Sequence, residues 1–310
     1  MRVLHGRLGA DFDRPTALTL GNFDGVHRGH QALIARTLEL AQTHQAEAGV
    51  VLFEPQPREF FGGAAAPPRL YSLAQKLEAL RALGLPLVRV LHFDAALAAL
   101  SAEKFVRDVL LAELKAKALL VGDDWRFGCD RQGDFSLLQA LQADGAYVLE
   151  RSETVLAAGE RISSTRVRAV LAEGDIGLAN DLLGRAYAVR GPVIYGRQLG
   201  RQIGAPTANV RLRRIPPLRH GVYVCWLDGL PAVANFGTKP TLEGEPPSLE
   251  VHVLDRQLEL YNRRVEIRFA AWLRAEQRFP GVAALAEQIQ RDVAAARDWH
   301  AAHPQKQSRA

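Results

Sequence analysis

A change in hydrophobic periodicity near residue 184 divides this chain into two parts. Before it, short apolar runs alternate with stretches that have the spacing of amphipathic helices. After it, the runs are short and alternating, and Gly, Pro and Asp turns separate them, Asp228-Gly229 being a hairpin signal. A chain of 310 residues is long enough for two domains. The sequence therefore predicts one domain over residues 1–181 and another over residues 182–310.

The first domain is predicted to be α/β, with a doubly wound, Rossmann-like parallel sheet, because strands and helices alternate strictly along it. Ligands of such folds bind beyond the carboxyl ends of the strands. The expected strands are residues 17–21, 49–53, 88–93, 119–122 and 146–149. The expected helices are residues 31–42, 73–83, 102–111 and 135–142.

The second domain is predicted to be an antiparallel β-barrel or sandwich followed by a C-terminal helix. Its expected strands are residues 188–194, 222–227, 232–235, 249–254 and 265–269. Residues 282–299 return to helical spacing. In both domains the apolar residues are sufficient for a buried core, since 48% of the chain is hydrophobic and 24% is charged.

Cysteine usage and hydropathy predict a cytoplasmic protein. The only cysteines are Cys129 and Cys225, too few for a disulfide framework or a four-ligand zinc site. The first residues lack the apolar stretch of a signal peptide, and no run approaches the roughly 20 apolar residues that span a membrane. We therefore expect no membrane partner.

Basic residues are concentrated in one segment. The chain has 39 Lys and Arg against 34 Asp and Glu, but residues 182–227 contain no acidic residue and eight arginines. Such a segment can bind nucleic acid or attract small polyphosphates, or it can reflect only an Arg-rich composition. It has no interleaved aromatic residues and no RNA-binding motif, so we expect no nucleic-acid partner.

The sharpest motif is Gly-Asn-Phe-Asp-Gly-Val-His-Arg-Gly-His, residues 21–30, which follows the first expected strand and opens the first expected helix. Free backbone N–H groups and the positive end of a helix bind anions at such a position. His27 and His30 are three residues apart and so lie on one side of the first helical turn. They can donate hydrogen bonds to a phosphate as negative charge develops on it. The alternative is a Gly-rich turn with two capping or solvated histidines.

This motif resembles the signature of bacterial bifunctional riboflavin kinase/FAD synthetases, a version of the His-x-Gly-His nucleotidyltransferase motif. The resemblance continues, in the order typical of that family, through residues 53–57, 121–128 and 161–168, and it covers the chain from about residue 2 to residue 297. It implies an enzyme that phosphorylates riboflavin to FMN and then adenylylates FMN to FAD, releasing pyrophosphate. ATP is the implied co-substrate and Mg²⁺ the implied cofactor of both steps.

The resemblance implies a role for particular residues in the first domain. His27 and His30 are the implied catalytic residues for adenylyl transfer. Hydroxyls and cations just ahead of a helix suit the two phosphates that leave as pyrophosphate, although a plain helix cap has the same composition. Pro57, Phe60 and Phe61 are the implied apolar wall for the isoalloxazine ring, with ordinary core packing as the alternative. The implied ligand-binding residues are Gly21, Asn22, Phe23, Asp24, Gly29, Asp124, Arg161, Ser163, Ser164, Thr165 and Arg168.

The second domain carries a segment that resembles the riboflavin-kinase loop of the family, residues 196–209. Thr207 and Asn209 offer the hard oxygen ligands that Mg²⁺ accepts. Glu250 matches the family's general base for the ribityl 5′-hydroxyl. It is expected on the polar face of its strand with His252, opposite Leu249, Val251 and Val253. Without the resemblance, Glu250 is an exposed-face residue of a half-buried strand. The implied nucleotide-binding residues are Gly196, Arg197, Gly200, Gly204, Pro206, Thr207 and Asn209.

The chain departs from the family pattern at four positions: Gln56 stands where His is usual, Trp125 where Phe is, Lys239 where Arg is, and Asn262 where Gly is. Lys239 keeps the charge but loses the bidentate guanidinium, and Asn262 tolerates left-handed backbone geometry. One rival interpretation is a nucleotidyltransferase of another substrate class. A class I aminoacyl-tRNA synthetase also uses a turn like His-x-Gly-His. It would need a Lys-rich second signature, but residues 162–166 of this chain read Ile-Ser-Ser-Thr-Arg.

Overall fold

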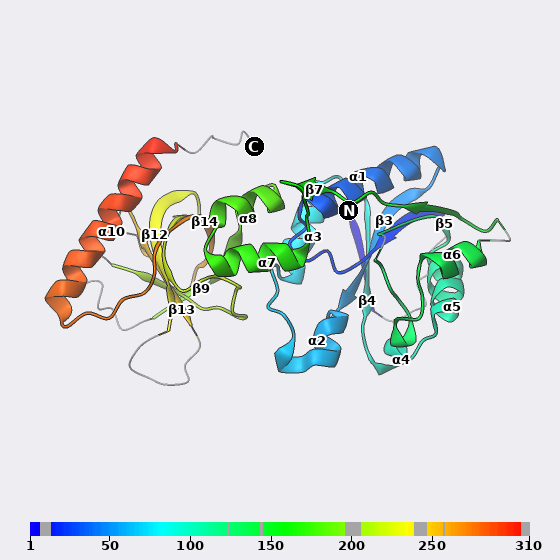
Figure 1. The fold of residues 1–310 in the computed structure, drawn as a ribbon, viewed down its shortest axis with the longest axis horizontal. Helices are drawn as coiled ribbons and strands as arrows, with labels where there is room; N and C mark the ends of the chain where they lie inside the picture. Colours follow the sequence, from blue (N-terminus) through cyan, green and yellow to red (C-terminus); the bar gives the residue numbers. More distant parts are fainter. Residues whose placement is uncertain are drawn as a thin grey trace. The chain divides into compact units, whose positions relative to one another are not determined.

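The computed structural model describes residues 1–6, 14–122, 124–142, 145–195, 206–238, 247–256 and 258–304. The chain divides into two compact units, Met1–Ser164 and Thr165–Ala310 (Figure 1). This division falls earlier than the boundary predicted after Asp181, because the two helices that follow Ser163 belong with the second unit.

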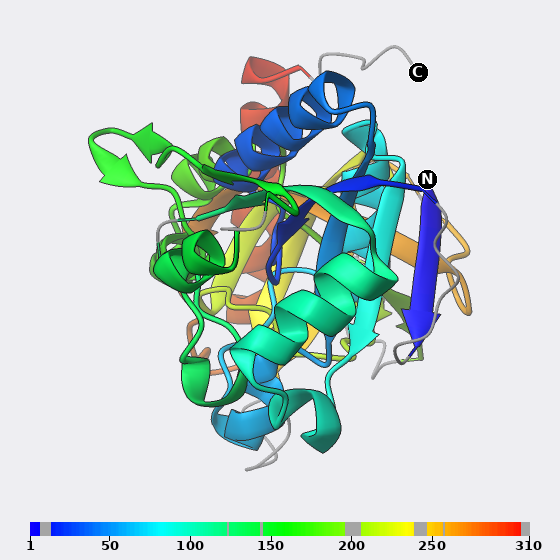
Figure 2. The same cartoon turned by 90° about the vertical axis from the view of Figure 1, so that its right-hand side faces the viewer.

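The first unit contains a parallel sheet of six strands in the order β1-β4-β3-β2-β5-β6. Figure 2 shows β1 at one edge of it, next to the N-terminus. This confirms the predicted doubly wound sheet. Its strands are β1 (Arg2–Gly6), β2 (Thr16–Leu20), β3 (Glu47–Glu54), β4 (Leu87–His92), β5 (Ala116–Val121) and β6 (Val148–Arg151).

Helices cover both faces of this sheet (Figure 1). One core joins the sheet to α1 and α3 through residues such as Ile34 and Leu80. The other joins it to η2 and α6 through Val106 and Leu138. Because both faces are covered, β2 is buried along its whole length. The helices are α1 (Arg28–Thr43), α2 (Pro57–Gly62), η1 (Gly63–Ala65), α3 (Leu73–Ala82), α4 (Ala95–Ala98), α5 (Ala102–Lys104), the π-helical η2 (Phe105–Glu113), η3 (Cys129–Arg131) and α6 (Phe135–Leu141).

The second unit is built on a closed barrel, so the barrel and not the sandwich is the correct alternative. Its strands follow the order β10-β13-β12-β11-β14-β9, all antiparallel. They are β9 (Ala188–Ile194), β10 (Ala208–Val210), β11 (Gly221–Leu227), β12 (Leu230–Gly237), β13 (Ser248–Val253) and β14 (Arg264–Arg274).

Helices α8 (Ile176–Leu183) and the C-terminal α10 (Val282–Ala302) pack on the barrel, and α7 (Ser164–Glu173) precedes α8 in the chain. Asn180 of α8 donates a side-chain hydrogen bond to the Phe269 carbonyl oxygen at 3.0 Å and accepts one from the Tyr187 N–H at 2.7 Å. Val293 and Ala296 of α10 pack against the outside of β11 and β12. The two short strands β7 (Leu156–Ala157) and β8 (Glu160–Arg161) form a hairpin that precedes α7.

Candidate functional site

The sequence between β2 and α1 forms a tight turn at the carboxyl end of the sheet. Phe23, Gly25 and Val26 have positive φ values of 46°, 79° and 40°. Left-handed geometry is unfavourable for Phe and Val, and both side chains are buried beneath the turn. Tertiary packing therefore holds the backbone in a shape that residues 21–26 would not adopt alone.

The two histidines of the motif lie at the start of α1. His27 is the N-cap and not a residue of the first turn, and α1 begins at Arg28, three residues before the helix expected over residues 31–42. Its Nδ1 accepts a hydrogen bond from the His30 N–H at 3.3 Å. The two rings stack with centroids 3.6 Å apart, so both imidazoles do lie on one side of the helix start. Capping and phosphate binding are compatible for His27. Because its Nδ1 accepts a hydrogen bond, a neutral imidazole carries its proton on Nε2, and this N–H can donate to a phosphate.

The segment before α7 lies against this turn. The Ser164 hydroxyl donates to the Asp24 carbonyl oxygen at 2.9 Å. At Gly29, a Cβ would lie 3.4 Å from the Ile162 carbonyl oxygen and 3.2 Å from His27 Nδ1, which explains glycine at this close approach. The structure thus brings Ser163 and Ser164 next to the start of α1. Thr165 and Arg168 are not ahead of the helix, as the sequence suggested, but within α7, in the second unit.

Asp124 and Arg161 form a bidentate ion pair at 2.8 and 3.0 Å. The Arg161 guanidinium holds the pKa of the Asp124 carboxyl below its ordinary value. Their side chains are 68% and 48% exposed, so the pair contributes little to stability and both groups are accessible to a ligand. The prediction that each contacts nucleotide or flavin remains a prediction.

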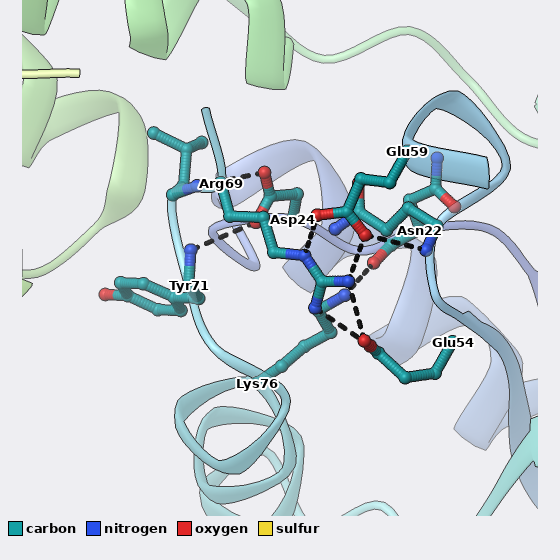
Figure 3. Close-up of polar contacts among 9 residues, drawn as sticks. Asn22, Asp24, Glu54, Glu59, Arg69, Tyr71 and Lys76 are labelled. Carbon is teal, nitrogen blue, oxygen red and sulfur yellow. Dashed lines mark hydrogen bonds and ion pairs between the residues drawn. The ribbon is translucent and has the colours of Figure 1, made fainter. Parts of the chain in front are cut away.

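A polar network beneath the turn was not predicted from the sequence. The Asp24 carboxylate accepts from the Leu70 and Tyr71 N–H groups, each at 3.0 Å. The Lys76 ammonium donates to the Asn22 carbonyl oxygen at 2.6 Å. Figure 3 shows these contacts around the buried turn. Asp24 thus shapes the turn with its side chain, and its contact with a ligand stays a prediction.

Arg69 belongs to the same network. Its guanidinium donates to the Glu54 carboxylate at 2.6 and 2.9 Å and also pairs with Glu59 of α2 (Figure 3). One sequence signal could have found part of this network: Lys76 occupies a position on α3 that lies between the core-facing Leu73, Leu77 and Leu80. A lysine on an apolar helix face calls for a buried partner.

Aromatic residues gather on α2 and after β4. Phe60 and Phe61 are 40% and 71% exposed, and their ring centroids lie 5.4 and 5.9 Å from that of Phe93. Trp125 stacks on Phe127 with centroids 4.4 Å apart, so the Trp replaces the usual Phe without loss of an aromatic contact. An exposed aromatic cluster of this kind is typical of a site that binds a flat apolar ligand.

In the second unit, two neighbouring strands of the barrel bring the predicted kinase residues together. Asn209 of β10 lies directly opposite Glu250 of β13, so the two side chains share one face. Thr207 precedes Asn209 by two residues and lies just before β10 begins. The burial of β13 alternates as expected, with Leu249, Val251 and Val253 inside and Glu250 and His252 outside. Among the described residues no hydrogen bond or ion pair engages the Glu250 carboxylate.

The donor set on these two strands fits Mg²⁺. A Thr hydroxyl, an Asn amide oxygen and a carboxylate are hard oxygen ligands, and Mg²⁺ commonly takes only one or two protein ligands plus phosphate oxygens and water. The described part of the chain contains no group of three or more His, Cys, Asp or Glu that could hold a metal. Pro206 precedes Thr207, and its carbonyl oxygen lies 2.9 Å from His252 Nδ1. Lys239 and the predicted Gly196, Arg197, Gly200 and Gly204 lie outside the described residues.

Comparison with known proteins gives a family for each part of the chain. Residues 10–166 match the family model of FAD synthetase, and residues 183–300 match that of riboflavin kinase. Bifunctional riboflavin kinase/FMN adenylyltransferases are 45% identical in Escherichia coli K12 and 46% identical in Pseudomonas fluorescens. These matches cover 91% and 92% of this chain and 92% and 93% of the respective relatives.

The fold has a counterpart among solved structures. A crystal structure described as a macrolide-efflux protein from Streptococcus pneumoniae superposes with a TM-score of 0.83 and 27% sequence identity. The match covers 94% of this chain and 96% of that one. No helix within the described ranges is long and apolar enough to cross a membrane. With two family models in order and relatives matched over nearly their whole length, the chain belongs to the bifunctional riboflavin kinase/FMN adenylyltransferase family.

Proposed function

We propose that the chain phosphorylates riboflavin to FMN in its second unit and adenylylates FMN to FAD in its first. ATP is the donor in both reactions, and pyrophosphate leaves in the second. The observation that carries this proposal is that each unit has its own group of residues suited to phosphate chemistry. The stacked His27 and His30 stand at a helix N-terminus in one unit, and Asn209 stands beside Glu250 in the other.

For adenylyl transfer, an FMN phosphate oxygen attacks the α-phosphorus of ATP and the bond to pyrophosphate breaks. His27 and His30 donate hydrogen bonds to the α-phosphate as its charge increases. The backbone N–H groups of Asn22 and Phe23 and the start of α1 bind the same anion. Arg161, Ser163 and Ser164 of the first unit hold the two departing phosphates.

For phosphorylation, Glu250 accepts the proton of the ribityl 5′-hydroxyl as the hydroxyl oxygen attacks the γ-phosphorus of ATP. The bond from the γ-phosphorus to the bridging oxygen breaks, and ADP leaves. The half-buried Glu250 carboxylate needs no rearrangement for this role, since the described residues leave it without a cation partner. Thr207 and Asn209 would hold Mg²⁺, which when bound neutralises the charge that develops on the phosphates. Positioning by these strands carries most of the rate enhancement in such reactions.

The location of the protein in the cell is also a proposal. Two cysteines without a disulfide accord with a cytoplasmic location. We propose that the acid-free arginine segment, residues 182–227, serves small polyphosphates and not nucleic acid, because it overlaps the kinase loop of residues 196–209.

The test is to incubate the purified chain with riboflavin, ATP and Mg²⁺ and to separate the flavins by chromatography over time. FMN should accumulate first and FAD should follow, and chelation of Mg²⁺ should stop both. Supplying FMN directly should give FAD without a lag. A chain that converts neither flavin under these conditions would contradict the proposed function.

A further inference from the structure

A buried cation lies beneath the nucleotide turn, at a position that neither proposed reaction assigns a role. Lys76 of α3 is fully buried, and its Nζ donates to the Asn22 carbonyl oxygen at 2.6 Å (Figure 3). The charged groups that act on it are Asp24 of the turn, Glu54 of β3, Glu59 of α2 and Arg69. The lysine therefore reaches the turn from a helix that starts some 50 residues later in the chain.

Peptide geometry determines what this contact does. In a trans peptide the C=O and N–H bonds point in opposite directions. The Asn22 carbonyl and the Phe23 N–H belong to one peptide unit, so a carbonyl held toward Lys76 directs the Phe23 N–H away from the buried side. That N–H has no acceptor among the described residues. It is therefore available to a phosphate oxygen at the mouth of the turn.

The same contact opposes backbone strain. Phe23 has φ 46°, in a region that L-residues avoid. A charge-assisted hydrogen bond to the preceding carbonyl is stronger than a neutral one and helps to fix this conformation. Burial lowers the pKa of Lys76 to about 8 despite its acidic neighbours, which shows that the charged form is unfavourable there. A leucine at this position of α3 would be less costly to bury. A lysine that the fold tolerates at this cost points to a role in function.

We propose that Lys76 is a positioning residue for FMN adenylylation, which fixes the Asn22–Phe23 peptide so that its N–H faces the ATP phosphates. The proposal rests on the proposed function. Arg69, seven residues earlier, provides a matched buried cation with a different task, because it binds Glu54 and Glu59 and so holds α2, which carries Phe60 and Phe61. Replacing Arg69 should therefore impair the binding of FMN, and replacing Lys76 should impair the use of ATP.

The experiment measures FMN adenylylation by Lys76→Met, which keeps the length of the side chain and removes the donor. Lys104→Met is the control, since Lys104 is an exposed lysine of α5 in the same unit. We expect Lys76→Met to lose about 10- to 100-fold in kcat/KM for ATP, the range that loss of a hydrogen bond to a charged group gives, with KM for FMN unchanged. Lys104→Met should match wild type. Riboflavin phosphorylation should be normal in both proteins.

Two further arms separate positioning from a general loss of structure. Arg69→Met should show the reverse pattern, a raised KM for FMN with little change in kcat/KM for ATP. The ratio of wild-type to Lys76→Met rates should be largest below pH 8 and should fall above it, as the ammonium loses its charge. If Lys76→Met fails to fold, Lys76→Gln replaces it.

Failure of the proposal is distinct from failure of the proposed function. If wild type makes no FAD from FMN, the function is wrong. If wild type is active and Lys76→Met is equally active, or if Lys76→Met and Arg69→Met lose both parameters alike at every pH, Lys76 has only a structural role.

Discussion

Replacing Lys76 with Met should change how the stability of the first unit depends on pH. The pKa of Lys76 falls from an ordinary value of 10.5 to about 8, chiefly because burial removes water from the ammonium. The folded chain therefore binds fewer protons at this site than the unfolded chain between pH 8 and 10.5. In that window the stability of wild type rises with pH.

The size of the effect follows from the same pKa. One pKa unit corresponds to about 1.36 kcal/mol, so the fall to about 8 corresponds to about 3 kcal/mol. Below pH 8 the buried charge is fully present and wild type bears this whole penalty. Above pH 10.5 the lysine is neutral in both states and the penalty disappears. The free energy of unfolding of wild type, relative to Lys76→Met, should therefore increase by about 3 kcal/mol from pH 7 to pH 10.5.

Urea unfolding followed by circular dichroism, on the full chain at pH 7, 8, 9 and 10.5, measures this difference. The second unit is an internal reference, because the substitution leaves it unchanged. Other groups titrate equally in both proteins and cancel in the comparison. Lys104→Met, which alters an exposed lysine, should give a difference that does not vary with pH. A difference for Lys76→Met that is independent of pH would refute the reasoning, and one that decreases as pH rises would show a raised pKa.

Three further predictions concern the two sites and the division of the chain. Replacing both His27 and His30 with Ala should reduce FMN adenylylation by at least about 10²–10³-fold while riboflavin phosphorylation stays normal, as chromatography of the flavins will show; unchanged FAD output would contradict the assignment. Glu250→Gln should reduce FMN formation by about 10²–10⁴-fold, with calorimetric ATP binding and FAD formation from supplied FMN unaffected; a normal kinase rate would make Glu250 a surface residue. The fragment 182–310 should fold and make FMN, but its Tm should lie below that of a fragment that also keeps α7 and α8, since only the longer one retains the Asn180 hydrogen bonds to the barrel; equal Tm values would show that these helices do not stabilise it.

Elements with a strong periodic signal were predicted from the sequence, and weaker ones were not. β2 is buried throughout and β13 alternates strictly, so both patterns are visible in the residues themselves. β1 is an edge strand with little burial, and β10 has only three residues, so neither has enough buried positions to show a period. The helix expected over residues 102–111 contains a π-helical stretch, η2, which apolar spacing does not distinguish from α-helix.

The candidate site also contains residues that the sequence predicts and contacts that it does not. His27 and His30 could be predicted because they lie in one short motif between a strand and a helix. The contacts of Asp24 with Leu70 and Tyr71 span more than 45 residues, and no local pattern records such a pairing. These contacts depend on how β3 and α2 lead the chain back to Asp24. That path is determined by the complete fold.

The residues that break ordinary rules of folding lie together in the first unit. Phe23 has left-handed backbone geometry and Lys76 is a buried cation, and either feature alone would make a sequence less stable. They meet at the Asn22–Phe23 peptide. Its carbonyl oxygen accepts a hydrogen bond from the Lys76 ammonium, and its N–H is that of Phe23. Local rules are usually broken where function requires it. A turn held from below by a buried ammonium can leave its N–H groups directed outward before any phosphate binds, and preorganised donors of this kind need no rearrangement when charge develops on the phosphate.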